Sequence, residues 1–170
     1  MRTSPTPARN RRGVTLIESL IAIGVLAVAI PLVFGAIAES GKSGMSAQAE
    51  TRSTWIVPVC MEEIRASREG KPEFFTSSKV GESIPPSGQV WALGFSPDGK
   101  PVGKVDKDAY EQGTREMGGQ PLLYIASIQT VESSTSSGNK PMFTVRVSVE
   151  YPAAAPKEKR QSLHFHTRIP

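Results

Sequence analysis

The segment Arg11-Arg12-Gly13-Val14-Thr15-Leu16-Ile17-Glu18 begins the stretch of sequence that decides the fold, an apolar run that extends to Ala38. As a helix, residues 14–38 would be about 37 Å long, which exceeds the roughly 30 Å hydrocarbon core of a bilayer. The run has no polar stripe after Ser19, so it is apolar on all sides, as a membrane-spanning helix is. The sequence therefore predicts a single transmembrane helix over residues 14–38.

Glu18 is the one acid inside this run. A charged side chain at the centre of a spanning helix costs about 2.5–3.5 kcal/mol on insertion scales, so Glu18 is interpreted as functional and is expected to meet a cationic group. The spacing Thr15-x-x-Glu18 also fits a capping box, in which Thr15 caps the helix and Glu18 accepts a hydrogen bond from the backbone N–H of Thr15. The two roles are compatible.

Four arginines precede the apolar run: Arg2, Arg9, Arg11 and Arg12. By the positive-inside bias they keep the N-terminus in the cytoplasm and place everything after Ala38 across the membrane. The chain has 20 Lys+Arg and 16 Asp+Glu, so that without these four arginines 16 basic residues stand against 16 acidic ones. The exported part therefore has no excess of positive charge with which to bind nucleic acid.

These residues resemble the start of type IV pilin-like proteins, the group of pilins, minor pilins and the pseudopilins of type II secretion. The resemblance rests on Arg11-Arg12-Gly13, on Val14 to Glu18 and on the apolar segment that follows. It implies that a prepilin peptidase cuts after Gly13 and that Val14, where the family more often has phenylalanine, becomes the N-methylated first residue. Our hypothesis is that Glu18 then pairs with the new terminal amine of a neighbouring subunit and sets the register of assembly.

The same resemblance implies the organisation and role of the chain. Residues 1–13 would be a cytoplasmic leader, residues 14–38 a transmembrane and filament-core helix, and residues 39–170 an extracytoplasmic head. The chain would be a structural subunit, a minor pilin or pseudopilin, of a type IV pilus-like or type II secretion filament. It would reside in the bacterial inner membrane before it enters the filament, with a prepilin peptidase and other pilin or pseudopilin subunits as its partners.

Two other export signals compete with this interpretation. Ala36-Ile37-Ala38 fits the cleavage site of an ordinary secretory signal, although the apolar region is longer than the usual 7–15 residues and contains an acid. The residues from Arg11 to Leu16 loosely match a twin-arginine signal. In these cases the mature chain would begin near Glu39, or remain uncut as an anchor, and the head would be an exported or membrane-anchored binding domain.

Helical spacing returns after the polar residues 39–44 and continues to about residue 68. Ile56, Cys60 and Ile64 recur at every fourth position, so this face is expected to lie on a sheet. Kinks or local unwinding are expected at Pro31 and Pro58, because each proline removes a backbone hydrogen bond.

The remainder of the chain is predicted to form strands. Residues 143–151 and 163–169 alternate between apolar and polar side chains, which is typical of half-buried strands, and residues 152–160 would join them in a hairpin. Further strands are expected at residues 89–95, 101–105 and 122–131, and loops at residues 96–100, 85–88 and 132–140. The basic residues of the hairpin loop are expected to be solvated: Lys157, Lys159 and Arg160.

Together these elements predict an α+β fold, a long N-terminal helix packed on an antiparallel sheet of four or five strands. The final hairpin and Glu62-Glu63-Ile64-Arg65 also resemble minor pilins. The Asp98-Gly99 turn and the closing hairpin are similar to those of the pilin-like cassette protein B group of Verrucomicrobia.

Motifs for catalysis or metal binding are weak. His164 and His166 would share one face of the last strand as half of a zinc site, but no further ligand is placed near them, so two solvated side chains are expected. The acids within residues 106–111 lack the glycine of an EF-hand, and a polar loop is predicted there. There is no Walker A motif and no G-x-S-x-G. We therefore expect a non-enzyme without cofactor or metal.

Cys60 is the only cysteine, so no disulfide can form within the chain. Its place on the apolar helix face predicts a small core residue. A disulfide between chains is the alternative.

Overall fold

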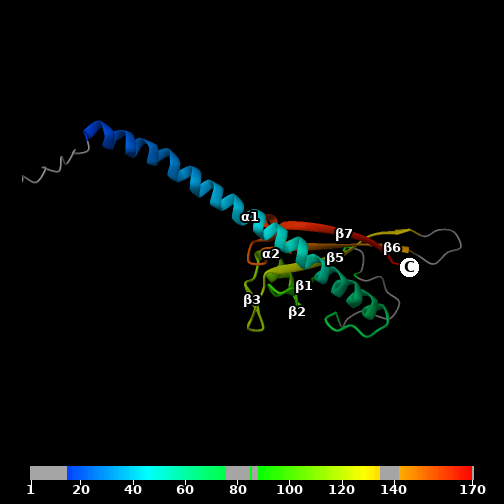
Figure 1. Cartoon of the computed structure of the whole chain (residues 1–170). Helices are drawn as coiled ribbons and strands as arrows, with labels where there is room; N and C mark the ends of the chain where they lie inside the picture. The colour runs from blue at the N-terminus through cyan, green and yellow to red at the C-terminus, as the bar shows by residue number, and fades with distance from the viewer. Residues whose placement is uncertain (1–14, 76–84, 86–87, 135–141, 170) are drawn as a thin grey trace, which may run out of the picture. The chain divides into compact units, whose positions relative to one another are not determined.

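The structure is a computed structural model that describes residues 15–75, 85, 88–134 and 142–169. The chain divides into two compact units, Met1–Gly44 and Met45–Pro170. One helix, α1 (Leu16–Arg68), provides nearly all of the described part of the first unit and the first element of the second (Figure 1). The helix predicted over the apolar run, and its continuation to about residue 68, are confirmed.

The two prolines inside α1 do not interrupt it. Of the predicted kinks or local unwinding at Pro31 and Pro58, the unwinding is wrong, because α1 is a continuous helix through both residues; the kinks stay a prediction. Around Pro58 the reason is packing, since Ile56 and Cys60 on either side of it are fully buried. These contacts hold the helical path that the missing hydrogen bond would otherwise weaken.

α1 ends in a turn that Gly70 makes possible. Gly70 has a φ of 76°, a left-handed conformation that glycine adopts at little cost. Its N–H donates to the carbonyl of Ser67, and the N–H of Lys71 donates to the carbonyl of Ala66. This pair of hydrogen bonds is a Schellman motif, which closes the helix and turns the chain away from its axis.

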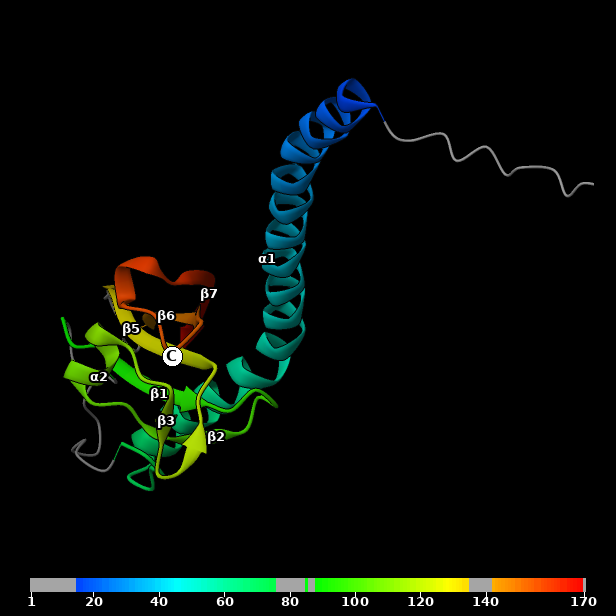
Figure 2. The same ribbon diagram turned by 90° about the vertical axis from the view of Figure 1, so that its left-hand side faces the viewer.

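The head contains a five-stranded sheet in the order β2-β1-β5-β6-β7 (Figure 2). Its strands are β1 (Trp91–Phe95), β2 (Pro101–Lys104), β5 (Tyr124–Ser134), β6 (Met142–Tyr151) and β7 (Gln161–Ile169). Every neighbouring pair is antiparallel. The predicted α+β fold, a long N-terminal helix packed on a small antiparallel sheet, is therefore confirmed.

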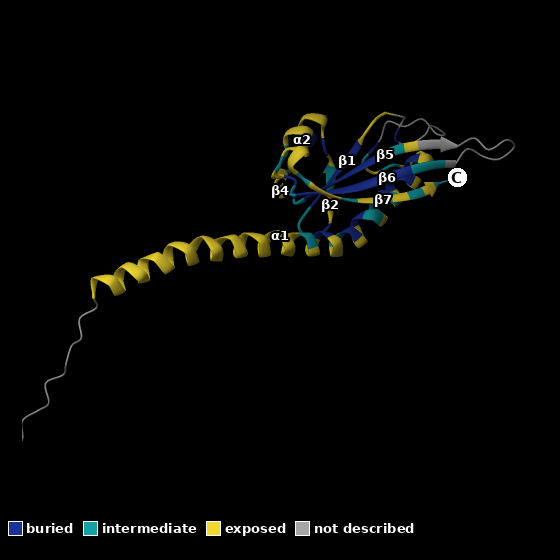
Figure 3. Ribbon diagram, turned by 90° about the horizontal axis from the view of Figure 1, so that it is seen from above, coloured by how far each residue is buried: buried dark blue, intermediate teal, exposed yellow. Residues whose placement is uncertain are grey.

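The head portion of α1 packs on one face of this sheet. Ile56, Cys60 and Ile64, the predicted apolar face, are only 0–1% exposed. They share a core with side chains of the strands, including Leu93, Phe95, Tyr124, Ile128, Val145, Val147 and Val149. In Figure 3 the buried residues of the head portion of α1 and of the strands are dark blue. Burial of each large apolar side chain stabilises the fold by about 1.5–3 kcal/mol, so this layer is the main source of the head's stability.

The other face of the sheet is covered by α2 (Lys107–Gln112), which lies across the sheet from the head portion of α1 (Figure 3). Tyr110 of α2 is 4% exposed and belongs to a second, smaller core with Ala92, Val105, Leu122, Ile125 and Ala153. The polar loop predicted for residues 106–111 is therefore wrong. Its charged residues occupy the exposed positions of a short helix whose single aromatic residue is buried.

The strand boundaries differ from the predicted ones where pairing overrides local composition. We predicted a loop from residue 132, but β5 continues to Ser134 because Ser133 and Ser134 pair with Phe143 and Met142 of β6. An irregularity between Thr130 and Glu132 interrupts the register there. A two-stranded hairpin of β3 (Glu116–Met117) and β4 (Gln120–Pro121) was not predicted. Residues 135–141, and residues 86 and 87 of the predicted loop 85–88, lie outside the described residues.

Glu63, near the end of α1, holds the segment that follows the helix. Its Oε1 accepts hydrogen bonds from the backbone N–H groups of Phe74 and Phe75 at 2.8 and 2.9 Å, and its Oε2 accepts one from Glu73 at 3.1 Å. The Phe75 ring stacks on Trp91 with ring centroids 4.3 Å apart. Glu63 is 5% exposed, so this acid within the predicted apolar helix face satisfies buried backbone donors.

The buried position of Cys60 predicts low reactivity. Burial raises the pKa of the Cys60 thiol to about 12, and the thiolate is the reactive form. At pH 8 we expect iodoacetamide to label Cys60 in denaturant but not in the native protein, as measured by mass spectrometry. A control with Cys60→Ala and a new cysteine at the exposed Thr54 should be labelled in the native state. Rapid labelling of native Cys60 would contradict its place in the core.

Candidate functional site

The N-terminal end of α1 carries the predicted capping box. The backbone N–H of Thr15 donates to Glu18 Oε2, and the backbone N–H of Glu18 donates to Thr15 Oγ1, each at 3.4 Å. Only the first of these hydrogen bonds involves the carboxylate, and it is long, so the carboxylate retains acceptor capacity for a charged donor. Gly13 and Val14, the predicted processing residues, lie outside the described residues. The pairing of Glu18 with a terminal amine stays a prediction.

The stem, by which we mean residues 15–38, exposes its apolar side chains. The large apolar residues from Leu16 to Ile37 are 50–86% exposed. Within the described part of the chain, α1 is the one helix that is long and apolar enough to cross a membrane. An apolar surface of this size is stable only when it is covered by lipid or by other protein. The stem is therefore suited to membrane anchoring.

Glycines in α1 offer space for close helix packing. A Cβ placed on Gly24, Gly35, Gly41 or Gly44 would meet nothing within 4 Å. Small residues allow the backbones of neighbouring helices to approach closely in a membrane. Gly24 and Gly35 lie within the stem, so its apolar surface includes positions at which the backbone of a neighbouring helix could approach closely.

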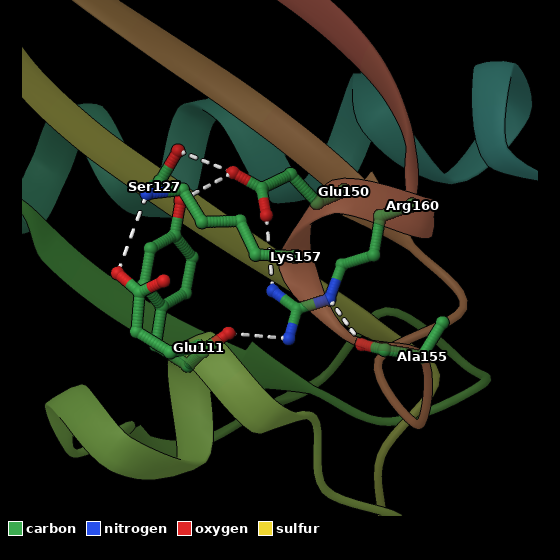
Figure 4. A network of polar contacts seen from close by, with 7 residues as sticks. Glu111, Ser127, Glu150, Ala155, Lys157 and Arg160 are labelled. Atoms are coloured by element: carbon green, nitrogen blue, oxygen red, sulfur yellow. Dashed lines mark hydrogen bonds and ion pairs between the residues drawn. The ribbon is translucent and has the colours of Figure 1, made fainter.

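A buried polar cluster lies in the head, between β6 and α2 (Figure 4). Glu150 Oε1 accepts hydrogen bonds from Tyr110 Oη at 2.7 Å and from Ser127 Oγ at 2.9 Å. Its Oε2 pairs with the guanidinium of Arg160 at 3.0 Å. Arg160 also donates from Nε to the carbonyl oxygen of Ala155 at 2.8 Å and from its other terminal nitrogen to the carbonyl oxygen of Tyr110.

One prediction is wrong at this cluster. Arg160 was expected in a solvated loop, but its side chain is only 1% exposed, and that of its partner Glu150 is 9% exposed. The outward face is covered there by α2 and by the loop after β6. The sequence contains one signal for this contact, because Glu150 is the single acid among the alternating polar residues of β6.

The electrostatics of the cluster keep the Tyr110 hydroxyl protonated. Burial raises the pKa of Tyr110, and the hydrogen bond to Glu150 raises it further, while Ser127 and the charge of Arg160 act in the opposite direction. Tyr110 therefore remains a neutral donor to the carboxylate. The guanidinium of Arg160 lies 5.2 Å from the centre of the Tyr110 ring, so the ring also contacts the cation that balances Glu150.

The cluster joins segments that are distant in sequence. Glu150 lies on β6, Ser127 on β5, Tyr110 on α2, and Arg160 at the end of the loop that precedes β7. Nearby, Lys157 pairs with Glu111 of α2 at 3.4 Å. Both oxygens of the Glu150 carboxylate are hydrogen-bonded, and these contacts fasten the loop and α2 onto the sheet.

The two histidines lie on the outward face of β7, as predicted. His164 Nδ1 is 2.8 Å from Ser148 Oγ, and His166 Nε2 accepts a hydrogen bond from Arg146 Nε at 3.1 Å. The partners are thus a serine and an arginine of β6. Among the described residues, no group of three or more His, Cys, Asp or Glu side chains could hold a metal ion.

The comparisons with known proteins concern the N-terminal end. A family model described as the prokaryotic N-terminal methylation motif matches residues 8–30. No curated protein and no solved structure matches the chain. The matched range contains Gly13, Val14 and Glu18 together with the first part of the stem. The chain therefore carries a type IV pilin-like prepilin signal, which marks a substrate for prepilin processing and pilin-type assembly in general.

Loss of one partner of the buried ion pair should destabilise the head strongly. In Arg160→Ala the carboxylate of Glu150 would remain buried without its cation, and we expect a loss of about 3–5 kcal/mol in the free energy of unfolding. The matched control is Lys157→Ala, which removes a half-exposed ion pair and should change that free energy by about 0–1 kcal/mol. Denaturant unfolding of the detergent-solubilised chain measures both. Equal, small effects would contradict the structural role of the cluster.

Proposed function

We propose that the chain is a structural subunit, a minor pilin or pseudopilin, of a type IV pilus-like or type II secretion filament. The observation that carries the proposal is the stem, whose apolar side chains have no partner among the described residues and which begins within a methylation motif. A prepilin peptidase would cut after Gly13 and expose Val14 for methylation. The stem would then leave the lipid to pack against the stems of other subunits.

The membrane topology of the proposal follows from charge. The leader arginines keep the N-terminus in the cytoplasm, and the head faces the periplasm. A peptidase on the cytoplasmic side would reach the leader there. The head would serve as a packed, non-catalytic body on the outside of the filament, and its two cores and buried ion pair support a rigid role of this kind.

Glu18 is proposed to set the register of assembly. Cleavage after Gly13 would create a terminal amine in the same apolar layer as Glu18, and opposite charges attract more strongly in a layer of low dielectric constant. The carboxylate has acceptor capacity beyond its one long hydrogen bond, which it accepts from the backbone N–H of Thr15. A buried pair of this type serves registry better than stability, so it would fix how far one stem is shifted along another.

The mass of the protein from native membranes tests the processing step. We expect intact-mass spectrometry to show a chain that begins at methylated Val14, because the proposed cleavage position lies within the matched methylation motif. A chain that begins at Glu39 would instead indicate an ordinary secretory signal and an exported binding domain. An uncut chain would indicate a simple membrane anchor, and either result would overturn the proposal.

Substitution of Glu18 tests the register hypothesis. Glu18→Gln removes the charge but keeps the size, so we expect normal membrane insertion and a large loss of filament incorporation, measured by shearing filaments from cells and quantifying the subunit. The matched control is Glu39→Gln, an exposed acid of the same helix whose contact is with Lys42 at 3.8 Å. This control should assemble normally. If Glu18→Gln assembles as well as the control, Glu18 has no role in register.

A further inference from the structure

The two edges of the sheet are protected very differently. β2 is four residues long, begins with Pro101, has an irregular register with β1 and ends at Lys104. Short length, proline, lysine and irregular pairing are the features by which proteins prevent edge strands from pairing with other chains. β7, at the opposite edge, is nine residues long and pairs with β6 without a register shift (Figure 2).

The outer edge of β7 has no strand partner within the described residues. An edge strand presents a row of unpaired N–H and C=O groups, which can accept an added strand. β7 contains no proline, and its pairing with β6 is unbroken from Gln161 to Ile169. Among the described elements, this edge is therefore the one built to continue the sheet.

The inward side chains of β7 indicate what the added strand must provide on that face. Leu163, Phe165 and Ile169 pack against the main core but remain partly exposed. An added strand would place alternate side chains beside them. Apolar side chains at these positions would complete the cover of the core at this edge.

The outward face of β7 requires the opposite chemistry. His164, His166 and Arg168 are exposed there, and Arg146 of β6 lies opposite His166. Among the side chains described on this face of β6 and β7, the one acid is Glu150, which is buried and already paired with Arg160. The exposed charge is therefore positive, and acidic side chains on an added strand would pair with it.

We infer that β7 is a docking edge for an extended segment of a partner protein in which apolar and acidic residues alternate. The backbone of the segment would continue the ladder of the sheet, its apolar residues would cover Leu163, Phe165 and Ile169, and its acids would meet Arg168 and the histidines. The inference rests on the head alone, so it holds whether or not the chain enters a filament.

Hydrogen exchange of the full-length protein in detergent tests this inference. The probe is a synthetic peptide of alternating valine and glutamate, acetylated and amidated, about eight residues long to match the nine residues of β7. We expect it to slow the exchange of β7 amides and leave those of β2 unchanged. A peptide of the same sequence in which every backbone nitrogen is methylated should give no protection, because it has no N–H donor on either edge with which to extend the ladder.

Charge reversal tests whether acidic side chains of the peptide pair with Arg168 or whether any strand can bind this edge. Arg168→Glu should weaken binding of the valine–glutamate peptide about fivefold, which is the effect of one cross-strand charge pair. The same substitution should improve binding of a valine–lysine peptide. Fluorescence anisotropy measures both affinities. Lys104→Glu, an exposed charge on the opposite edge, is the matched control and should change neither affinity. Absence of β7 protection at saturating peptide, protection of β2 instead, or equal binding of acidic and basic peptides would each overturn the inference.

Discussion

The apolar surface of the stem is the constraint on which the rest of the chain depends. Exposure of an uninterrupted apolar helix to water is unfavourable. The apolar side chains of the stem are not covered by the described residues of their own chain. It must therefore sit in lipid or against other proteins at every stage of its existence. Anchoring in a membrane and pilin-type assembly are two ways to meet that requirement.

The same helix behaves differently once it enters the head. From Ala49 onward about every third or fourth residue of α1 is buried. In the head, the sheet covers this apolar face of the helix. The head is then closed by polar contacts at two places, Glu63 after the helix and Glu150 with Arg160 under the last loop. Each of these carboxylates is buried because it satisfies donors that would otherwise be unpaired.

Much of the fold could be predicted from periodicity, because burial on one face leaves a pattern in the sequence. The apolar helix face at Cys60 and the alternating strands β6 and β7 were predicted in this way and are confirmed. The capping box at Thr15 and Glu18 was also readable, since it depends on residues three apart. The role of Glu18 in assembly depends on a second chain, and it remains a prediction.

The failures have the opposite cause, because they depend on contacts between residues far apart in sequence. Arg160 looks like a loop cation until α2 and Glu150 are placed beside it, and Glu150 is 40 residues from Tyr110. Ser133 and Ser134 look like loop residues until β6 pairs with them. In the same way, Tyr110 alone gives no indication that its polar neighbours form a helix over a second core. A buried polar contact of this kind has no period that a sequence pattern could reveal.

The contact between Arg160 and Glu150 also has a consequence for the timing of folding. A loop held by an ion pair and backbone acceptors needs no oxidant, no thiol exchange and no correct choice among cysteines, and the single cysteine of the chain is enclosed elsewhere. The head can therefore complete its folding without waiting for a redox step, and reductants in its surroundings would not loosen it.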